Sequence, residues 1–284
     1  MTTLLDARRA GLARLQAAGV PDAAQDIAVL LSHVLGITRA DMALISPQTP
    51  LTAAQITTWD AALTARAARR PVSHITGTRL FWGRSFAVGP DVLDPRPETE
   101  TLIAAALGVP FSRVLDLGTG SGCILLTLLA ERAGRNGEGP AGLGVDISAP
   151  ALAVAQTNAS LLGIGAAFAL GHWFDPVEGR FDLIISNPPY IATDELAGLA
   201  PEVRDWEPHL ALTPGADGLE AYRILVAQAP AYLTPGGWLM VEIGPSQAAA
   251  VMGFFDAAGF LGIQNLRDLD GRDRVVIGQI GAAD

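Results

Sequence analysis

Residues 113–130 read RVLDLGTGSGCILLTLLA, and this stretch decides the fold. Its first part, residues 113–117, is short and apolar and carries an acid near its end, which predicts a buried parallel strand. Three glycines follow at alternate positions and remove every Cβ that would keep a ligand away from the backbone. Residues 123–130 predict a helix that is apolar on most sides, as expected for a helix packed on a sheet. A strand, a glycine turn and a helix in this order predict an α/β fold that holds a ligand at the turn.

The spacing of the glycines indicates which ligand. A dinucleotide fingerprint places its third glycine three positions after the second, whereas Gly122 comes two positions after Gly120. A strand-end acid followed by Gly-x-Gly-x-Gly resembles the S-adenosylmethionine loop of class I methyltransferases. Asp116 is then expected to place negative charge near the ammonium group of that cofactor. Asp146 ends the next predicted strand, where an acid accepts hydrogen bonds from ribose hydroxyls. Alternatively, the glycines only make a tight turn and Asp146 caps the helix that follows.

A second motif follows the predicted strand at residues 181–186 and reads Asn187-Pro188-Pro189-Tyr190. Ligands collect outside the carboxyl ends of parallel strands, so Asn187 is expected beside the methyl donor. The Asn187 side-chain oxygen and the Pro188 carbonyl can each accept one N–H of a planar amide or amine, which orients and polarises its nitrogen. The prolines stiffen the loop, and the Tyr190 ring offers a flat surface to the substrate. Catalysis is therefore assigned to Asn187, Pro188 and Tyr190, and substrate binding to these residues with Pro189. The alternative is an Asx turn with two loop prolines.

Composition narrows the function classes. The chain has 284 residues and a formal net charge of −10, which argues against stable binding of nucleic acid. The single cysteine, Cys123, excludes a disulfide within the chain, and the four scattered histidines show no metal-ligand spacing, so no metal site is expected. No signal peptide or charge-free apolar span is visible. A cytoplasmic monomer without membrane contact is expected.

Periodicity divides the chain into three parts. Residues 4–18, 23–35 and 52–69 have helical periodicity and predict a small helical bundle, with a capping box at Thr52 and Gln55. Residues 72–77 and 79–88 predict the two strands of a β-hairpin. From Glu98 onward, helices alternate with apolar strands, which predicts a doubly wound, mostly parallel sheet. The glycine-rich residues 134–142 predict a surface loop. The expected parts are residues 1–70, 71–96 and 97–284.

From the hairpin to the C-terminus the chain resembles the HemK/PrmC family, the N5-glutamine methyltransferases of peptide chain release factors. The matching pieces are Pro71-Val72 with Ile75-Thr76-Gly77, Phe81-Trp82-Gly83, Pro95 to Glu100, the glycine loop, Asn187 to Tyr190, Glu207-Pro208, Glu242-Ile243-Gly244 with Gln247, and Gly271-Arg272-Asp273-Arg274. The resemblance implies a class I methyltransferase domain preceded by a helical substrate-docking domain. It also implies that the methyl acceptor is the glutamine in the Gly-Gly-Gln motif of class I release factors.

The same resemblance implies a set of cofactor contacts. They are Gly118, Thr119, Gly120, Ser121, Gly122, Asp146, Trp173 and Asn187. The Trp173 indole can stack on adenine, although a role as a core tryptophan is the alternative. Two positions depart from the family pattern: His172 stands where an acid is usual, and Asp94 stands where an aliphatic residue is usual.

Several roles remain open from the sequence. Arg96 and Glu100 either brace the hairpin or form an ordinary salt bridge, and Glu207-Pro208 is either a substrate lid or a structural turn. Arg272 and Arg274 either meet an acidic patch or, in the simpler interpretation, are surface charge flanking a strand. Two further functions compete with glutamine methylation: N6-adenine or N2-guanine methylation of nucleic acid, and a binding module without catalysis.

Overall fold

The computed structural model describes residues 1–134 and 139–282. The chain forms two compact units. One consists of residues 1–78 together with 200–206, and the other of residues 79–199 together with 207–284. A short piece of chain that follows the Asn-Pro-Pro-Tyr motif therefore belongs to the first unit, which we call the helical unit. We call the second the sheet unit.

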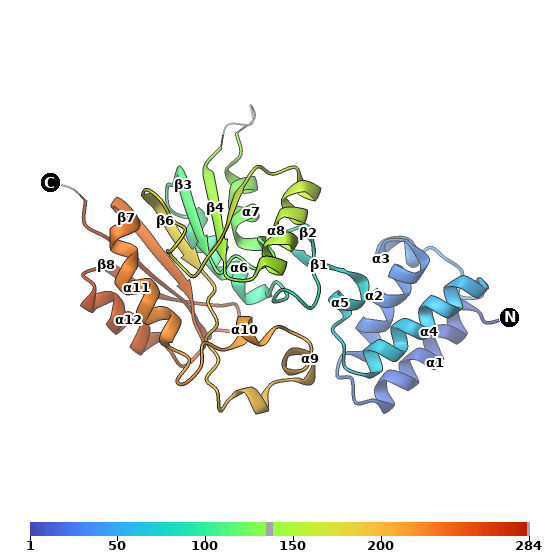
Figure 1. The fold of residues 1–284 in the computed structure, drawn as a ribbon. Helices are drawn as coiled ribbons and strands as arrows, with labels where there is room; N and C mark the ends of the chain where they lie inside the picture. The colour runs from blue at the N-terminus through green and yellow to red at the C-terminus, as the bar shows by residue number, and fades with distance from the viewer. Residues whose placement is uncertain (135–138, 283–284) are drawn as a thin grey trace. The chain divides into compact units, whose positions relative to one another are not determined.

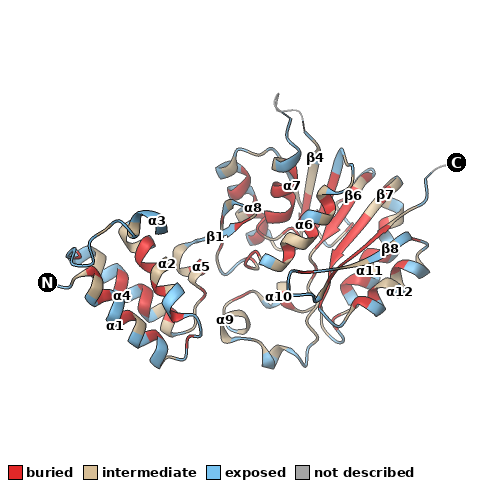
Figure 2. Ribbon diagram, turned by 180° about the vertical axis from the view of Figure 1, so that it is seen from behind, coloured by how far each residue is buried: buried red, intermediate tan, exposed pale blue. Residues whose placement is uncertain are grey.

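The helical unit consists of short helices around an apolar core (Figures 1 and 2). Its helices are α1 (Leu4–Ala17), α2 (Ala23–Leu35), α3 (Arg39–Met42), α4 (Ala53–Ala67), α5 (Val72–Thr76) and α9 (Pro201–Arg204). The three predicted helices are confirmed, and so is the capping box of Thr52 and Gln55, which satisfies backbone donors at the start of α4. Thr3 and Asp6 form a second capping box at α1.

The strand predicted at residues 72–77 is wrong, because these residues form helix α5. Val72 and Ile75 are three positions apart, which places them on one face of a helix, and both pack against the helical core. This packing outweighs the strand preference of β-branched residues. Gly77 ends α5 in a left-handed conformation, with φ 75°. The hairpin is shorter than predicted, with β1 at Thr78–Phe81 and β2 at Arg84–Ala87.

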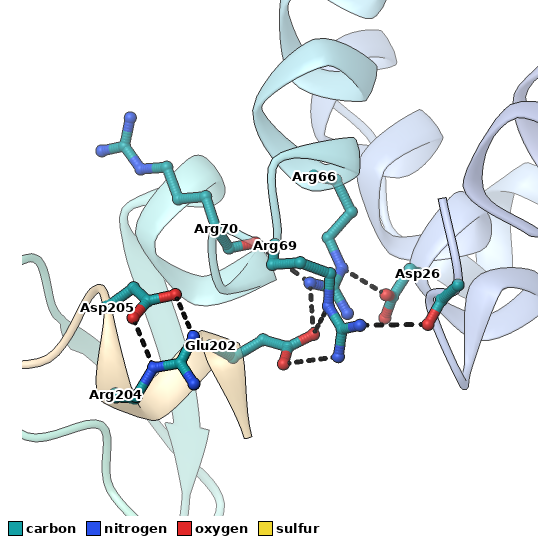
Figure 3. A network of polar contacts seen from close by, with 8 residues as sticks. Asp26, Arg66, Arg69, Arg70, Glu202, Arg204 and Asp205 are labelled. Carbon is teal, nitrogen blue, oxygen red and sulfur yellow. Dashed lines mark hydrogen bonds and ion pairs between the residues drawn. The ribbon is translucent and has the colours of Figure 1, made fainter. Parts of the chain in front are cut away.

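Glu202 ties helix α9 to the rest of the helical unit (Figure 3). Its carboxylate accepts hydrogen bonds from Arg66 Nη1 at 2.9 Å and from Arg69 Nε and Nη2 at 2.6 and 2.7 Å. Arg66 also donates to Asp26 on α2. The Arg70 guanidinium lies over the ring of Trp206, 5.6 Å from its centroid. Residues 200–206 are thus held by ion pairs and a cation–π contact.

The sheet unit contains a seven-stranded sheet in the order β5-β4-β3-β6-β7-β9-β8 (Figure 1). Its strands are β3 (Arg113–Leu117), β4 (Ala141–Asp146), β5 (Ala167–Leu170), β6 (Phe181–Ser186), β7 (Leu233–Glu242), β8 (Leu261–Arg267) and β9 (Asp273–Gln279). All neighbouring pairs from β5 to β7 are parallel, and β9 is antiparallel to both of its neighbours. The predicted doubly wound, mostly parallel sheet is confirmed. Residues 135–138 of the predicted loop at 134–142 lie outside the described residues, and residues 141–142 belong to β4.

Helices cover both faces of this sheet (Figure 1). Helices α6 (Glu100–Leu107), α7 (Cys123–Arg132) and α8 (Ala149–Leu162) contribute to one hydrophobic cluster, and α11 (Glu220–Tyr232) and α12 (Ala248–Ala257) to the other. Successive residues of β6 alternate between the clusters: Leu183 and Ile185 belong to the first, and Ile184 to the second. Burial on both faces explains why the three central residues of this strand, 183–185, are all apolar. None of the helices in the described parts of the chain is long and apolar enough to cross a membrane.

Candidate active site

A cavity of about 340 Å³ opens at the carboxyl ends of β3, β4 and β6 in the sheet unit. The strand order reverses at β3, which pairs with both β4 and β6, and ligands of open α/β sheets bind at such a point. The cavity brings together most of the predicted site residues. Gly118, Thr119, Gly120, Ser121, Asp146, Trp173, Asn187 and Pro189 line it. Among the predicted site residues that the structure describes, Asp116, Gly122, Pro188 and Tyr190 do not line it.

The glycine loop forms part of the cavity wall and depends on its backbone conformation. The amide groups of Gly118 and Thr119 both donate to the carbonyl of Val145, at 2.8 and 3.0 Å, which binds the loop to the end of β4. Gly118, Gly120 and Gly122 have φ angles of 73°, 53° and 77°. Only glycine adopts this left-handed region without strain, so the loop depends on these three residues.

Asp146 connects the loop to the next helix. Its Oδ2 accepts from the Gly120 amide and its Oδ1 from the Ser148 amide, both at 2.9 Å. Helix α8 is capped by the Ser148 hydroxyl, which accepts from the Ala151 amide, and not by Asp146. Burial raises the pKa of Asp146. Because each carboxylate oxygen has a second lone pair, Asp146 can still accept hydrogen bonds from hydroxyls in the cavity that it lines.

Asp116 is fully buried beneath the glycine loop. Its Oδ2 accepts from the Thr119 hydroxyl at 2.7 Å, and its Oδ1 has no hydrogen-bond partner in the described part of the chain. Burial raises the pKa of this carboxyl to about 7, although the hydrogen bond from Thr119 opposes the rise. Asp116 therefore acts on the cavity through Thr119, which does line it.

Trp173 belongs both to the core and to the cavity. Its half-buried ring packs against the cluster below α11 and α12, and it also lines the cavity. The ring stands edge-on to that of His172, with centroids 5.7 Å apart. Trp173 has a φ of 48°, an uncommon conformation for a residue with a side chain. The two sequence interpretations of Trp173 are thus compatible, since one face of an indole can pack while the other stays open.

Asn187 follows β6 directly and is held at one end of its side chain. Its Nδ2 donates to the Thr99 hydroxyl at 3.3 Å. Its Oδ1 is buried and has no partner among the residues that the structure describes. Leaving a buried acceptor unpaired costs about 1–3 kcal/mol, so such a group in a cavity wall indicates a ligand donor. The sequence predicted a role for Asn187 but not its partner Thr99.

The rest of the Asn-Pro-Pro-Tyr motif is held by a hydrogen bond to its last residue, Tyr190. Gln247 donates from Nε2 to the Tyr190 carbonyl at 2.8 Å, and its Oε1 accepts from the Gly244 amide at 2.9 Å. A Cβ on Gly218 would lie 2.3 Å from the Tyr190 carbonyl oxygen, so only glycine fits there. Burial raises the pKa of the Tyr190 phenol. Sequence reasoning missed Gly218, because a lone glycine in a loop gives no signal of what it approaches.

Arg96 anchors the chain segment that follows Trp206. Its Nη2 donates to both oxygens of Glu207, at 2.7 and 2.6 Å, and Glu207 is 5% exposed. Burial raises the pKa of Glu207 to about 7, although the charge of Arg96 lowers it. The neighbouring Pro208 lines the cavity, so this ion pair positions part of the wall. Glu100 instead accepts from the Trp82 amide at 3.0 Å and holds the hairpin turn.

Arg274 differs from its expected role. It is 5% exposed and donates to Asp268 from Nε and Nη2, both at 3.2 Å. The prediction of surface charge is therefore wrong for Arg274, although Arg272 is exposed. The buried Arg274 contributes positive charge near Glu242 at the end of β7.

Comparison with known proteins assigns the family. Residues 6–77 match the PrmC N-terminal domain, and residues 97–200 match the methyltransferase small domain. The chain is 55% identical to the release factor glutamine methyltransferase of Cereibacter sphaeroides, over 98% of this chain and 99% of that protein. The chain belongs to the release factor glutamine methyltransferase family. Its family relative from Rhodospirillum rubrum is 45% identical, over 96% of this chain and 84% of that protein.

The family assignment also agrees with the fold and the cofactor. A methyltransferase from Pyrococcus furiosus has the same fold, with a TM-score of 0.53 at 16% identity, over 78% of this chain and 98% of that one. The predicted class I methyltransferase fold and S-adenosylmethionine as cofactor are confirmed. The residues present fit this cofactor: a backbone cradle at the glycine loop, an acceptor at Asp146 and an indole at Trp173. The individual contacts, the monomeric state and the cytoplasmic location stay predictions.

Proposed function

We propose that this chain transfers a methyl group from S-adenosylmethionine to the side-chain nitrogen, N5, of the glutamine in the Gly-Gly-Gln motif of class I release factors. The observation that carries the proposal is the Asn187 carboxamide. It is held through Nδ2 by Thr99, its buried Oδ1 has no partner among the described residues, and it lines the same cavity as the glycine loop. The names of the curated relatives support the same substrate.

The chain's own residues contribute orientation and polarisation. When bound, S-adenosylmethionine supplies an electrophilic methyl group on a sulfonium. An amide nitrogen is a poor nucleophile, because its lone pair is delocalised into the carbonyl. The Asn187 Oδ1 and the Pro188 carbonyl accept the two N–H groups of the glutamine and aim the remaining lone pair into the cavity. Accepting these hydrogen bonds also stabilises the positive charge that grows on nitrogen during transfer.

No strong base is needed before the transfer in this scheme. The nitrogen becomes cationic as it gains the methyl group and then loses a proton to water or to a carbonyl. Gln247 holds the motif in place during this step, because it donates to the Tyr190 carbonyl, and Gly218 leaves the space that this carbonyl needs. The rate therefore depends on how firmly the loop is held more than on the basicity of a side chain.

Transfer of labelled methyl to a purified class I release factor tests the proposal. Wild-type chain should label the release factor but not a variant whose Gly-Gly-Gln glutamine is replaced by alanine. Asn187→Ala should reduce kcat by about 100-fold or more, the usual loss when one group that stabilises a transition state is removed. Asn265→Ala is the matched control, because Asn265 also has a buried Oδ1 with no partner in the described part of the chain but lies on β8, away from the cavity lining.

Two other outcomes would decide against the proposal. Labelling of RNA or DNA in place of the release factor would assign the site to an exocyclic amine. Binding of S-adenosylmethionine without transfer to any of these substrates would indicate a binding module.

A further inference from the structure

We propose that Thr99 and Glu242 are positioning residues that set which end of the Asn187 carboxamide faces the substrate. This inference rests on the proposed function and deepens it. The two residues act as a hydrogen-bond relay behind Asn187, and they hold its nitrogen end so that its oxygen end is available for the glutamine.

The fold brings these three residues together from three elements. Thr99 ends the short 3-10 helix η1 (Pro97–Thr99), Asn187 follows β6, and Glu242 ends β7. Strands β6 and β7 are parallel neighbours in which Ser186 pairs with Val241, so Asn187 and Glu242 are the next residues on adjacent strands. Thr99 is 2% exposed and Glu242 1% exposed. Both side chains are therefore buried, and Thr99 also lines the cavity beside Asn187.

The chemistry of Glu242, the last residue of the relay, determines which group donates each hydrogen bond. An ionised carboxylate only accepts hydrogen bonds, and a threonine hydroxyl has one hydrogen to give. Burial raises the pKa of Glu242, and the Thr99 hydroxyl opposes this rise as a hydrogen-bond donor, so its hydrogen is directed toward that carboxyl. The oxygen of that hydroxyl can then only accept, and it accepts from Asn187 Nδ2 at 3.3 Å. The Asn187 Oδ1 is left as the free end.

If the Oδ1 and Nδ2 of Asn187 exchanged places, the side chain could no longer accept a hydrogen bond from the glutamine. Its Oδ1 would meet the lone pairs of the Thr99 oxygen, and its Nδ2 would meet the NH₂ group of the incoming glutamine, donor against donor. The two ends of a carboxamide have nearly the same shape, so packing alone cannot choose between them. The ionised Glu242 carboxylate, which can only accept hydrogen bonds, determines the orientation of the Asn187 carboxamide through Thr99.

The Glu242 carboxyl is not required to hold its own strand. The Glu242 carbonyl accepts from the Tyr222 hydroxyl at 2.9 Å, and Glu242 pairs with Val275 on β9. One of its carboxylate oxygens, Oε2, has no hydrogen-bond partner in the parts of the chain that are described. The local backbone is thus fixed by other groups, and the Glu242 carboxyl interacts instead with Thr99 and with the charge of Arg274.

The inference is tested by substitutions that change which side chain donates a hydrogen bond but keep the side-chain volume. Thr99→Val removes the hydroxyl but keeps the shape, and Glu242→Gln keeps the shape but allows the side chain to donate as well as accept. Both should lower kcat for release factor methylation by about 10- to 100-fold and leave the KM for S-adenosylmethionine near the wild-type value. Thr99→Ser retains the hydroxyl and should restore most of kcat.

Thr127→Val is the matched control for Thr99→Val. Thr127 is also a fully buried threonine, it lies on α7, and it does not line the cavity. Its substitution should leave kcat unchanged. If Thr99→Val does not fold, Glu242→Gln and Thr99→Ser carry the test, because both are conservative in volume.

The inference is wrong if wild-type chain methylates the release factor and Asn187→Ala abolishes transfer, while Thr99→Val or Glu242→Gln keeps the wild-type kcat. A rise in the KM for S-adenosylmethionine with kcat unchanged would also overturn it, because that result assigns the pair to cofactor binding. Failure of the proposed function looks different, since wild-type chain itself would then not label the release factor.

Discussion

At the scale of single residues, the site depends on carboxyl groups that the fold keeps away from water. Burial raises the pKa of Glu242 to about 7, although the hydrogen bond from Thr99 and the charge of Arg274 lower it. Arg96 and Glu98 also act on this carboxyl, in opposite directions. The relay needs the ionised form, because a protonated Glu242 can donate to Thr99 and reverse the bond. Since a carboxyl ionises as pH rises through its pKa, kcat should rise through about pH 7.

Single-turnover methylation measured between about pH 5 and pH 9 checks this expectation. The rise near pH 7 should be present in wild-type chain and absent in Glu242→Gln, whose amide does not titrate in this range. Asp116 and Glu207 are also buried, each with its pKa raised to about 7, so they are the other sources to exclude. A rise that persists in Glu242→Gln would assign the titration to a different acid.

At the scale of elements, the Asn-Pro-Pro-Tyr loop is held by the segment before α11. Gly218 has a φ of 73°, and a Cβ there would lie 2.3 Å from the Tyr190 carbonyl oxygen. Gly218→Ala should therefore push the loop away from its anchor. We expect a loss of about 1–3 kcal/mol in the free energy of unfolding from the strained backbone, together with a fall in kcat from the displaced loop.

Gly215→Ala separates these two effects. Gly215 also has a positive φ, 94°, but a Cβ there would have no atom within 4 Å. The Gly215→Ala variant should lose stability because its backbone is strained, and it should keep the wild-type kcat. Urea denaturation measures the loss of stability. An equal fall in kcat in both variants would show that strain alone, and not the contact with Tyr190, controls activity.

At the scale of the whole molecule, the chain leaves the sheet unit after residue 199 and returns to it at residue 207. Glu202 holds the intervening segment in the helical unit, with a side chain that is only 19% exposed (Figure 3). Glu202→Gln removes the charge that faces Arg66 and Arg69. We expect a loss of about 2 kcal/mol in the free energy of unfolding of the helical unit at neutral pH, because Arg69 loses its carboxylate partner and Arg66 keeps only its bond to Asp26 among the carboxylates of the described residues.

The pH dependence of this loss has a definite sign. Burial alone would raise the pKa of Glu202, but the hydrogen bonds from Arg69 and Arg66 lower it from 4.5 to about 2. A depressed carboxyl pKa stabilises the folded state above the unfolded value, and this stabilisation is lost as pH falls. The difference between wild type and Glu202→Gln should therefore be full above about pH 5 and shrink toward pH 2.

Urea denaturation followed by circular dichroism measures this difference. Asp270→Asn is the matched control, because Asp270 forms an ion pair with Arg272 in which both side chains are more than half exposed. Exposed pairs contribute about 0–1 kcal/mol, so this variant should change little. A Glu202→Gln variant as stable as Asp270→Asn would contradict the role of Glu202 as an anchor.

Local patterns in the sequence were sufficient for the fold class, the cofactor and the family. The strand, glycine loop and helix at residues 113–130 and the Asn-Pro-Pro-Tyr motif each place their groups through backbone conformation over a few residues. Such short-range geometry depends on residue type and spacing, which can be read without knowing the rest of the molecule.

Tertiary structure alone decided how the site is supported. Residues 72–77 became helix because of the core that they meet. Asn187 and Thr99 are 88 positions apart, Arg96 and Glu207 are 111 apart, and Arg66 and Glu202 are 136 apart. A side-chain hydrogen bond needs its atoms within about 3 Å, and only the path of the chain through the whole fold determines which distant residues come so close.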